Sequence, residues 1–197
     1  MTIDRGRSLQ DLVEAGQRSF SFEFFPPRDE AGEEQLWRAV RALEPYRPTF
    51  VSVTYGAGGS SRGTTVRVTG RIARETSLVP MAHLTCVGHT ADELEAILDE
   101  YEAAGVRHVM ALRGDPAEGP RAPWTPTEGG LQYAVDLVEM AAARGTFRIG
   151  VAAFPSATRP RPPSTRTPTC WPPRPGPGRS SRSEEHTSEL QSPMYLV

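Results

Sequence analysis

The chain of 197 residues is long enough to bury one hydrophobic core, and its formal net charge of −2 gives no reason to expect a nucleic acid or an anionic membrane as partner. All 22 basic residues are Arg and none is Lys, which excludes catalysis through a Schiff-base lysine in this sequence. The first residues lack the apolar segment of a signal peptide, and no stretch approaches the roughly 20 apolar residues of a membrane span, so we expect a cytoplasmic protein.

Short apolar segments alternate with helical patterns through the first three quarters of the chain. The apolar segments, which we predict to be buried β-strands, are 20–25, 50–54, 79–85, 108–112 and 147–153. The stretches between them carry apolar residues at the spacing of amphipathic helices. In one of these stretches Thr90 and Glu93 form a capping-box pattern, and Gly105 marks the end of the helix. Strands and helices that alternate in this way predict parallel βαβ units.

Polar residues lie at or just after the carboxyl ends of the predicted strands, namely Glu23, Thr54, His83, Arg113 and Asp115. A doubly wound sheet and a TIM barrel both fit the alternation. A barrel builds its site from the ends of many strands, whereas an open sheet collects its ligand groups mainly at one switch point. The sequence therefore favours the α/β class and an incomplete TIM (β/α)8 barrel, with about five of the eight βα units.

The composition changes abruptly after Pro155. Nine of the 19 prolines lie between this residue and Pro177, and no acidic residue occurs from 140 to 183. Apolar periodicity is also lost, as in disordered Pro-rich segments. We therefore divide the chain into a partial barrel domain, residues 1–155, and a Pro/Arg-rich tail, residues 156–197, that we expect to be disordered.

The origin of the tail is a separate hypothesis. When the reading frame is shifted by one base, the codons around Cys170 can specify an ordinary amphipathic helix. We interpret the chain as truncated and frameshifted after about Pro155. Residues 182–192 resemble the translation of a sequencing adapter, so we assign no function to His186.

Glu23 lies between aromatic residues in the segment FEFFPP, residues 22–27. Apolar neighbours raise the pKa of a carboxyl group because desolvation disfavours the anion, and such a Glu can serve as a general acid near neutral pH. A structural ion pair between Glu23 and an Arg at the barrel mouth explains this motif equally well.

Three further segments carry polar groups at strand ends. The loop VTYGAGGS, residues 53–60, can offer backbone N–H groups to an anion or can simply turn tightly. His83 is by itself more typical of a satisfied core residue, and no second His or Cys stands at metal-binding spacing, so we expect no metal. In LRGD, residues 112–115, Arg113 can hold an anionic group and Asp115 can face a polar heterocycle, with a salt-bridged turn as the alternative.

Taken together and in this order, FEFFPP, VTYGAGGS, AHLTC (82–86) and LRGD resemble the methylenetetrahydrofolate reductase family of bacterial type, over residues 19–155. The resemblance implies a TIM barrel that binds FAD at the carboxyl ends of its strands. It also implies that NADH or NADPH passes a hydride to the flavin, which then reduces 5,10-methylenetetrahydrofolate to 5-methyltetrahydrofolate for one-carbon metabolism and methionine biosynthesis.

The resemblance also implies roles for individual residues. By motif position, Glu23 corresponds to the general acid, and Asp115 to the carboxylate near the flavin and the folate pterin. The residues that match flavin-contacting positions, together with Asp115, are Thr54, Tyr55, Ala57, His83, Arg113, Gly114, Tyr133, Ala134 and Phe154.

The tail departs from the family pattern. The His-Pro after the fifth strand, the FAD contacts of the next helix and a later folate-binding Gln have no counterparts. We therefore expect the chain as it stands to be poorly stable and inactive, and the full-length protein to be a homo-oligomer. The alternatives are a non-functional gene fragment, or another TIM-barrel enzyme such as a metal-dependent lyase.

Overall fold

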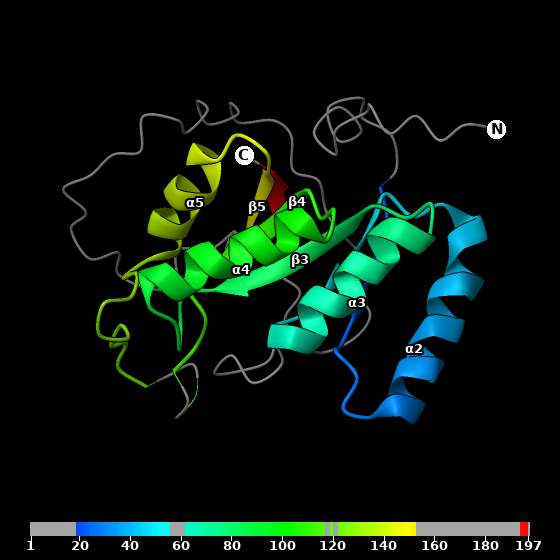
Figure 1. The fold of residues 1–197 in the computed structure, drawn as a ribbon, viewed down its shortest axis with the longest axis horizontal. Coiled ribbons are helices and arrows are strands. Elements are labelled where there is room, and N and C mark those ends of the chain that lie inside the picture. The colour runs from blue at the N-terminus through cyan, green and yellow to red at the C-terminus, as the bar shows by residue number, and fades with distance from the viewer. Residues whose placement is uncertain (1–18, 56–61, 117–118, 120–121, 153–193, 197) are drawn as a thin grey trace, which may run out of the picture.

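The computed structural model describes residues 19–55, 62–116, 119, 122–152 and 194–196. Five strands form one parallel sheet in chain order (Figure 1). They are β1 (Ser21–Phe24), β2 (Phe50–Val53), β3 (Pro80–Thr85), β4 (His108–Leu112) and β5 (Arg148–Ala152). Each lies within one predicted apolar segment. The α/β class and the arrangement of an incomplete barrel are thereby confirmed.

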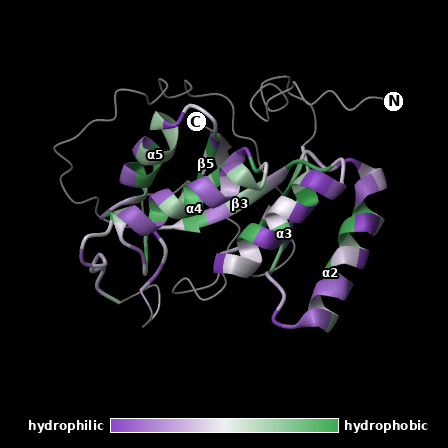
Figure 2. Cartoon of the chain, in the orientation of Figure 1, coloured by the Kyte–Doolittle hydropathy of each residue, from purple (hydrophilic) through white to green (hydrophobic). Residues whose placement is uncertain are grey.

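The helices lie together on one side of the sheet (Figure 1). They are α2 (Glu30–Leu43), α3 (Arg62–Glu75), α4 (Ala91–Ala103) and α5 (Ala134–Ala143), with a 3-10 turn η1 (Glu44–Tyr46) after α2. Helix α4 begins with the predicted capping box, in which the Glu93 N–H donates to Thr90 Oγ1 at 3.2 Å and the Thr90 N–H donates to Glu93 Oε2 at 2.9 Å. Hydrophilic residues occupy much of the visible surface of α2 and α3 (Figure 2).

The helix-facing side of the sheet is apolar because alternate residues of each strand point to it. One cluster joins β3 and β4 to α4 and α5, and another joins β1 and β2 to α2 and α3. Burying each large aliphatic side chain contributes about 1.5–3 kcal/mol. Completely buried members of the two clusters include Leu84, Leu94, Ile97, Leu98, Leu137, Val40, Val51, Val53 and Ile72.

The opposite side of the sheet corresponds to the interior of a barrel. Met81 and Met110 are buried there and pack with Phe50, Val79 and Leu112. Nearer the carboxyl ends of the strands this face becomes polar, with Glu23, Ser52, His83 and Thr85. Parallel strands bring these ends to one edge, so the fold gathers the predicted polar groups on that edge.

Arg144, just after α5, joins this helix to α4. Its guanidinium pairs with Glu95, lies 2.5 Å from Asp99 Oδ1 and lies 3.8 Å from Glu102 Oε2. One cation is therefore shared by three carboxylates on successive turns of α4. In the part of the chain that the structure describes, no helix has the length and apolar character needed to cross a bilayer.

A short sixth strand differs from the sequence prediction. β6 (Met194–Leu196) lies in the tail that we expect to be disordered, and it pairs antiparallel with β5, where Val151 faces Tyr195. The physical reason is that the outer edge of β5 would otherwise carry unpaired N–H and C=O groups. The rest of the tail and the domain boundary at 155 lie outside the described residues.

Candidate functional site

Glu23 contacts two side chains from neighbouring strands on the inner face. Ser52 lies beside it in the β1–β2 register, and Ser52 Oγ donates to Glu23 Oε2 at 3.4 Å. His83 Nε2 of β3 lies 3.6 Å from the same oxygen. Among the described residues, no Arg forms an ion pair with Glu23. Within that part of the chain, the alternative of an Arg–Glu23 ion pair is not observed.

The surroundings expected for Glu23 need a correction. Phe22 and Phe24 point to the helix side and pack with the apolar cluster there, because side chains alternate along a strand. The Glu23 side chain is 43% exposed on the opposite face. Its sequence neighbours therefore do not form an apolar pocket around the carboxyl group.

His83 is buried in this group, with 7% of its surface exposed. Burial lowers the pKa of its imidazole to about 4, so the ring is neutral near pH 7 and its approach to Glu23 is not an ion pair. Within the described residues, His83 Nε2 and Thr85 Oγ1 have no hydrogen-bond partner. Tyr101 of α4 donates to the His83 carbonyl at 3.1 Å, which fixes the strand behind the ring.

The segment after β4 makes a tight turn at Gly114, where φ is +82°. A Cβ at this position would overlap Val87 and lie 3.1 Å from Thr85 Cβ. The Val87 N–H donates to the Arg113 carbonyl at 3.0 Å, so the β3 and β4 ends are joined. Only glycine fits both the backbone angle and the space.

Arg113 is held by two residues of this turn and by Trp124. Its Nε donates to the Gly114 carbonyl at 3.1 Å, and its NH2 lies 3.6 Å from Asp115 Oδ1. The guanidinium carbon lies 4.7 Å from the centroid of the Trp124 ring. The Asp115 side chain is 61% exposed, so this pair contributes little to stability. The salt-bridged turn and a ligand-binding turn are both compatible with these contacts.

The other predicted flavin contacts are spread over several elements. Tyr133 caps the start of α5, where its N–H donates to Asp136 Oδ2 at 2.9 Å, and Ala134 is the first residue of this helix. Thr54 follows β2, and its carbonyl accepts from Thr65 Oγ1 at 3.2 Å. Ala57 and Phe154 lie outside the described residues.

Tyr55 does not lie with the inner-face group. It is buried in the cluster under α4, and its hydroxyl lies 3.0 Å from His89 Nε2. Burial raises the pKa of Tyr55 to about 12. Tyr55, which we predicted to contact the flavin, is therefore a core residue in the part of the chain that the structure describes. The chain after β2 turns the Tyr55 ring toward α4.

Two clusters of contacts therefore make up the candidate site. Glu23, Ser52 and His83 form one, and the Arg113–Asp115 turn with Trp124 forms the other. Their hydrogen bonds and ion pairs do not join the two clusters within the described chain. Sequence reasoning missed Ser52 and Trp124. Only the pairing of β1 with β2 could have indicated Ser52.

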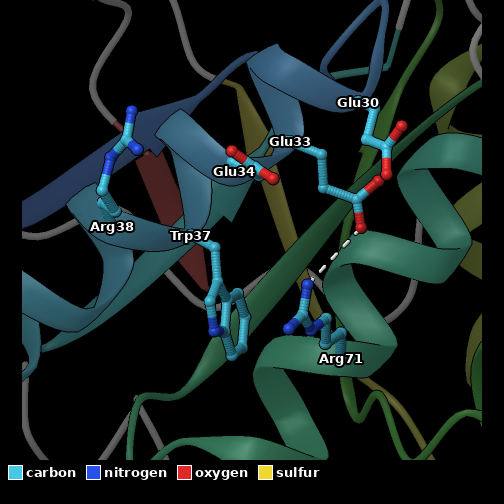
Figure 3. Close-up of a pocket in the computed structure, with 6 residues that line it drawn as sticks. All are labelled: Glu30, Glu33, Glu34, Trp37, Arg38 and Arg71. Carbon is cyan, nitrogen blue, oxygen red and sulfur yellow. Dashed lines mark ion pairs between the residues drawn. The ribbon is translucent and has the colours of Figure 1, made fainter.

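A cavity elsewhere does not belong to this site. It lies between α2 and α3 on the outer surface and is lined by Glu30, Glu33, Glu34, Trp37, Arg38 and Arg71 (Figure 3). Glu33 Oε1 lies 3.5 Å from Arg71 NH1. The helices separate this cavity from the inner face of the sheet.

The methylenetetrahydrofolate reductase family model matches residues 8–168. The chain belongs to this family. It is 42% identical over 151 residues to the 5,10-methylenetetrahydrofolate reductase of Pectobacterium carotovorum subsp. carotovorum, covering 76% of this chain and 47% of that protein. It is 43% identical over 147 residues to the protein of the same name from Salmonella typhimurium, covering 74% and 47%.

A plant relative shares the same region. Methylenetetrahydrofolate reductase (NADH) 1 of Arabidopsis thaliana is 37% identical over 151 residues, covering 76% of this chain and 25% of the plant protein. The chain thus matches about half the length of these bacterial reductases and a quarter of the plant reductase. The match to the family model extends beyond Pro155, to residue 168.

Proposed function

We propose that this chain carries the FAD-binding face of an oxidoreductase that uses NADH or NADPH to reduce 5,10-methylenetetrahydrofolate to 5-methyltetrahydrofolate. Membership of the family supports the reaction. The observation that carries the proposal is the buried His83 Nε2, which has no hydrogen-bond partner among the described residues and lies beside Glu23. Such an atom costs free energy unless a ligand or water satisfies it.

The residues present fit a flavin. His83 Nε2 and Thr85 Oγ1 offer polar contacts on the inner face, and the partly buried Leu112, which packs with Met81 and Met110, offers an apolar contact. A flavin ring needs both, because it has polar edges and apolar faces. At the neighbouring turn, Gly114 lets Val87 pack directly against the backbone. We propose His83, Thr54, the turn from Arg113 to Asp115, and Tyr133 and Ala134 as the residues that hold FAD.

When bound, FAD supplies the hydride transfer from the nicotinamide to the folate. Glu23 acts as the proton donor to the folate ring nitrogen that leaves as the five-membered ring opens. Ser52 orients the carboxyl group by its hydrogen bond to Oε2, and neutral His83 limits its rotation from the other side. Asp115 is 61% exposed and can accept hydrogen bonds from the folate. In this proposal Glu23 donates a proton, and Asp115 binds the folate.

The proposal also covers the compartment, the assembly and the activity of the protein. We propose that the full-length protein is a cytoplasmic homo-oligomer that supplies methyl groups for methionine synthesis. We further propose that the 197-residue chain is of low stability and does not reduce folate, but that the polar groups at the ends of β1 to β4 are enough to bind FAD. What we call the frame-restored protein keeps residues 1–155 and then returns to the family's reading frame, which on this proposal recovers the implied His-Pro and the helix with its FAD contacts.

The first test asks whether the chain binds FAD. The purified chain is mixed with FAD and passed over a desalting column, and we expect flavin absorbance to travel with the protein. A folded chain that emerges colourless would overturn the flavin assignment.

The second test separates the two half-reactions in the frame-restored protein. Glu23→Gln keeps the size of the side chain and removes its acid. We expect this variant to oxidise NAD(P)H with a quinone acceptor at nearly the normal rate, and to lose at least about 100-fold in folate reduction, as expected for loss of a general acid. Equal rates in both half-reactions would show that Glu23 is not the proton donor.

A further inference from the structure

Trp124 lies in the segment between β4 and α5 and contacts residues that flank both elements. Its ring packs against the Arg113 guanidinium with 4.7 Å between the guanidinium carbon and the ring centroid. Its indole Nε1 donates to the Gln132 carbonyl at 2.8 Å. Gln132 directly precedes Tyr133, the N-cap of α5. One side chain therefore connects the turn after β4 to the start of the next helix.

We infer that Trp124 is a positioning residue that orients Arg113 and the N-terminus of α5 for binding FAD. The inference rests on the proposed function and extends it to a residue that acts through its neighbours and not by touching the ligand. It depends on two contacts, one through the ring face and one through the indole N–H.

The ring face fixes the plane of the guanidinium. Arg113 Nε is already used by the Gly114 carbonyl, and NH2 lies near Asp115. A guanidinium has five N–H groups, so several remain for an anionic or carbonyl group of a ligand. Stacking on an aromatic ring restricts rotation of the group and thereby sets the direction of those N–H groups.

The indole N–H fixes where the ring lies. Of the hydrogen bonds among the described residues, only the one from this N–H to the Gln132 carbonyl links the Trp124 side chain to the segment that leads into α5. Because Gln132 Nε2 also donates to the Tyr133 hydroxyl at 3.3 Å, a shift of this residue would move the predicted flavin contact as well. A phenylalanine could keep the stacking but would lose this link.

The test measures FAD affinity by quenching of flavin fluorescence in the full 197-residue chain. We expect Trp124→Phe to weaken binding about threefold and Trp124→Ala about tenfold, since the first loses one contact and the second loses two. Arg113→Ala removes the group that Trp124 orients. In that background, Trp124→Ala should weaken binding by no more than about threefold, so the two effects should not add.

Trp37 provides a matched control. Its ring also stacks on an Arg, with the Arg71 guanidinium carbon 3.8 Å from the ring centroid, but it lies on the outer helices (Figure 3). Trp37→Ala should lower thermal stability and leave the FAD dissociation constant within about twofold. Circular dichroism shows that each variant is folded. If Trp124→Ala does not fold, Trp124→Phe carries the test.

The outcomes discriminate between the two proposals. Wild-type affinity in Trp124→Phe and Trp124→Ala, or fully additive effects with Arg113→Ala, would overturn the positioning role while leaving the flavin assignment intact. A folded wild-type chain that does not bind FAD would contradict the proposed function and this inference together.

Discussion

His83 shows how burial of a single residue links stability to pH. Burial lowers the pKa of its folded state to about 4, below the ordinary value of 6.5. Between these values the unfolded chain binds a proton that the folded chain does not bind. The contribution of a neutral His83 is therefore complete above pH 6.5 and is lost progressively as the pH falls toward 4.

We predict that His83→Gln removes part of this acid sensitivity. From pH 7 to pH 5 the wild-type chain should lose roughly 1–2 kcal/mol more of its free energy of unfolding than the variant, because Gln does not titrate in this range. Urea unfolding at several pH values measures this difference. Parallel curves for the two proteins would contradict the lowered His83 pKa. Tyr101→Phe, which keeps the imidazole, serves as a control with the wild-type pH dependence.

At the level of elements, the turn after β4 depends on Gly114 for two separate reasons. Its φ of +82° disfavours any residue with a Cβ, and Val87 occupies the space that the Cβ would need. Gly105 after α4 has the same φ, but a Cβ there would meet nothing within 4 Å. Substitutions at Gly105 and at Gly114 therefore separate the cost of backbone strain from the cost of steric overlap.

We predict that Gly105→Ala lowers the free energy of unfolding by about 1 kcal/mol and Gly114→Ala by roughly 2–4 kcal/mol. The second substitution should also weaken FAD binding, because the turn that holds Arg113 must shift. Chemical unfolding and flavin titration measure the two effects. If both variants lose the same stability, the close approach of Val87 is not a constraint.

The elements themselves were largely predictable from sequence, because their signals are local. Apolar runs located the five parallel strands, and the Thr90–Glu93 pattern located the start of α4. The site was predictable only in part. Parallel strands guarantee that Glu23 and His83 lie near one edge, but no local signal shows that Ser52 pairs with Glu23 or that Tyr55 turns under α4. Those features depend on strand register and loop path between distant residues.

At the level of the whole molecule, β6 covers the outer edge of β5. It comes from a segment whose composition predicts disorder, and it runs opposite to the strand that a parallel barrel would place there. An exposed strand edge will accept whatever segment can offer matching N–H and C=O groups. Pairing at the outer edge of β5 therefore depends on backbone N–H and C=O groups more than on any particular side chain.

We predict that Tyr195→Pro, which removes one N–H of β6, increases about tenfold the amide exchange of those residues of β5 whose N–H groups point toward β6. Tyr195→Val, which keeps the donor, should leave their exchange unchanged. Hydrogen–deuterium exchange followed by NMR resolves these amides, with β3 as an internal reference. Unchanged exchange in the proline variant would mean that β6 does not protect β5.

The cation shared between α4 and α5 restricts how this sequence can vary. If Arg144 were lost, the three carboxylates opposite it would remain as like charges on adjoining turns of one helix. If one carboxylate were lost, the guanidinium would still have two partners. The Arg position is therefore the less replaceable side of this arrangement, and acidic and basic substitutions here should occur together as compensating pairs.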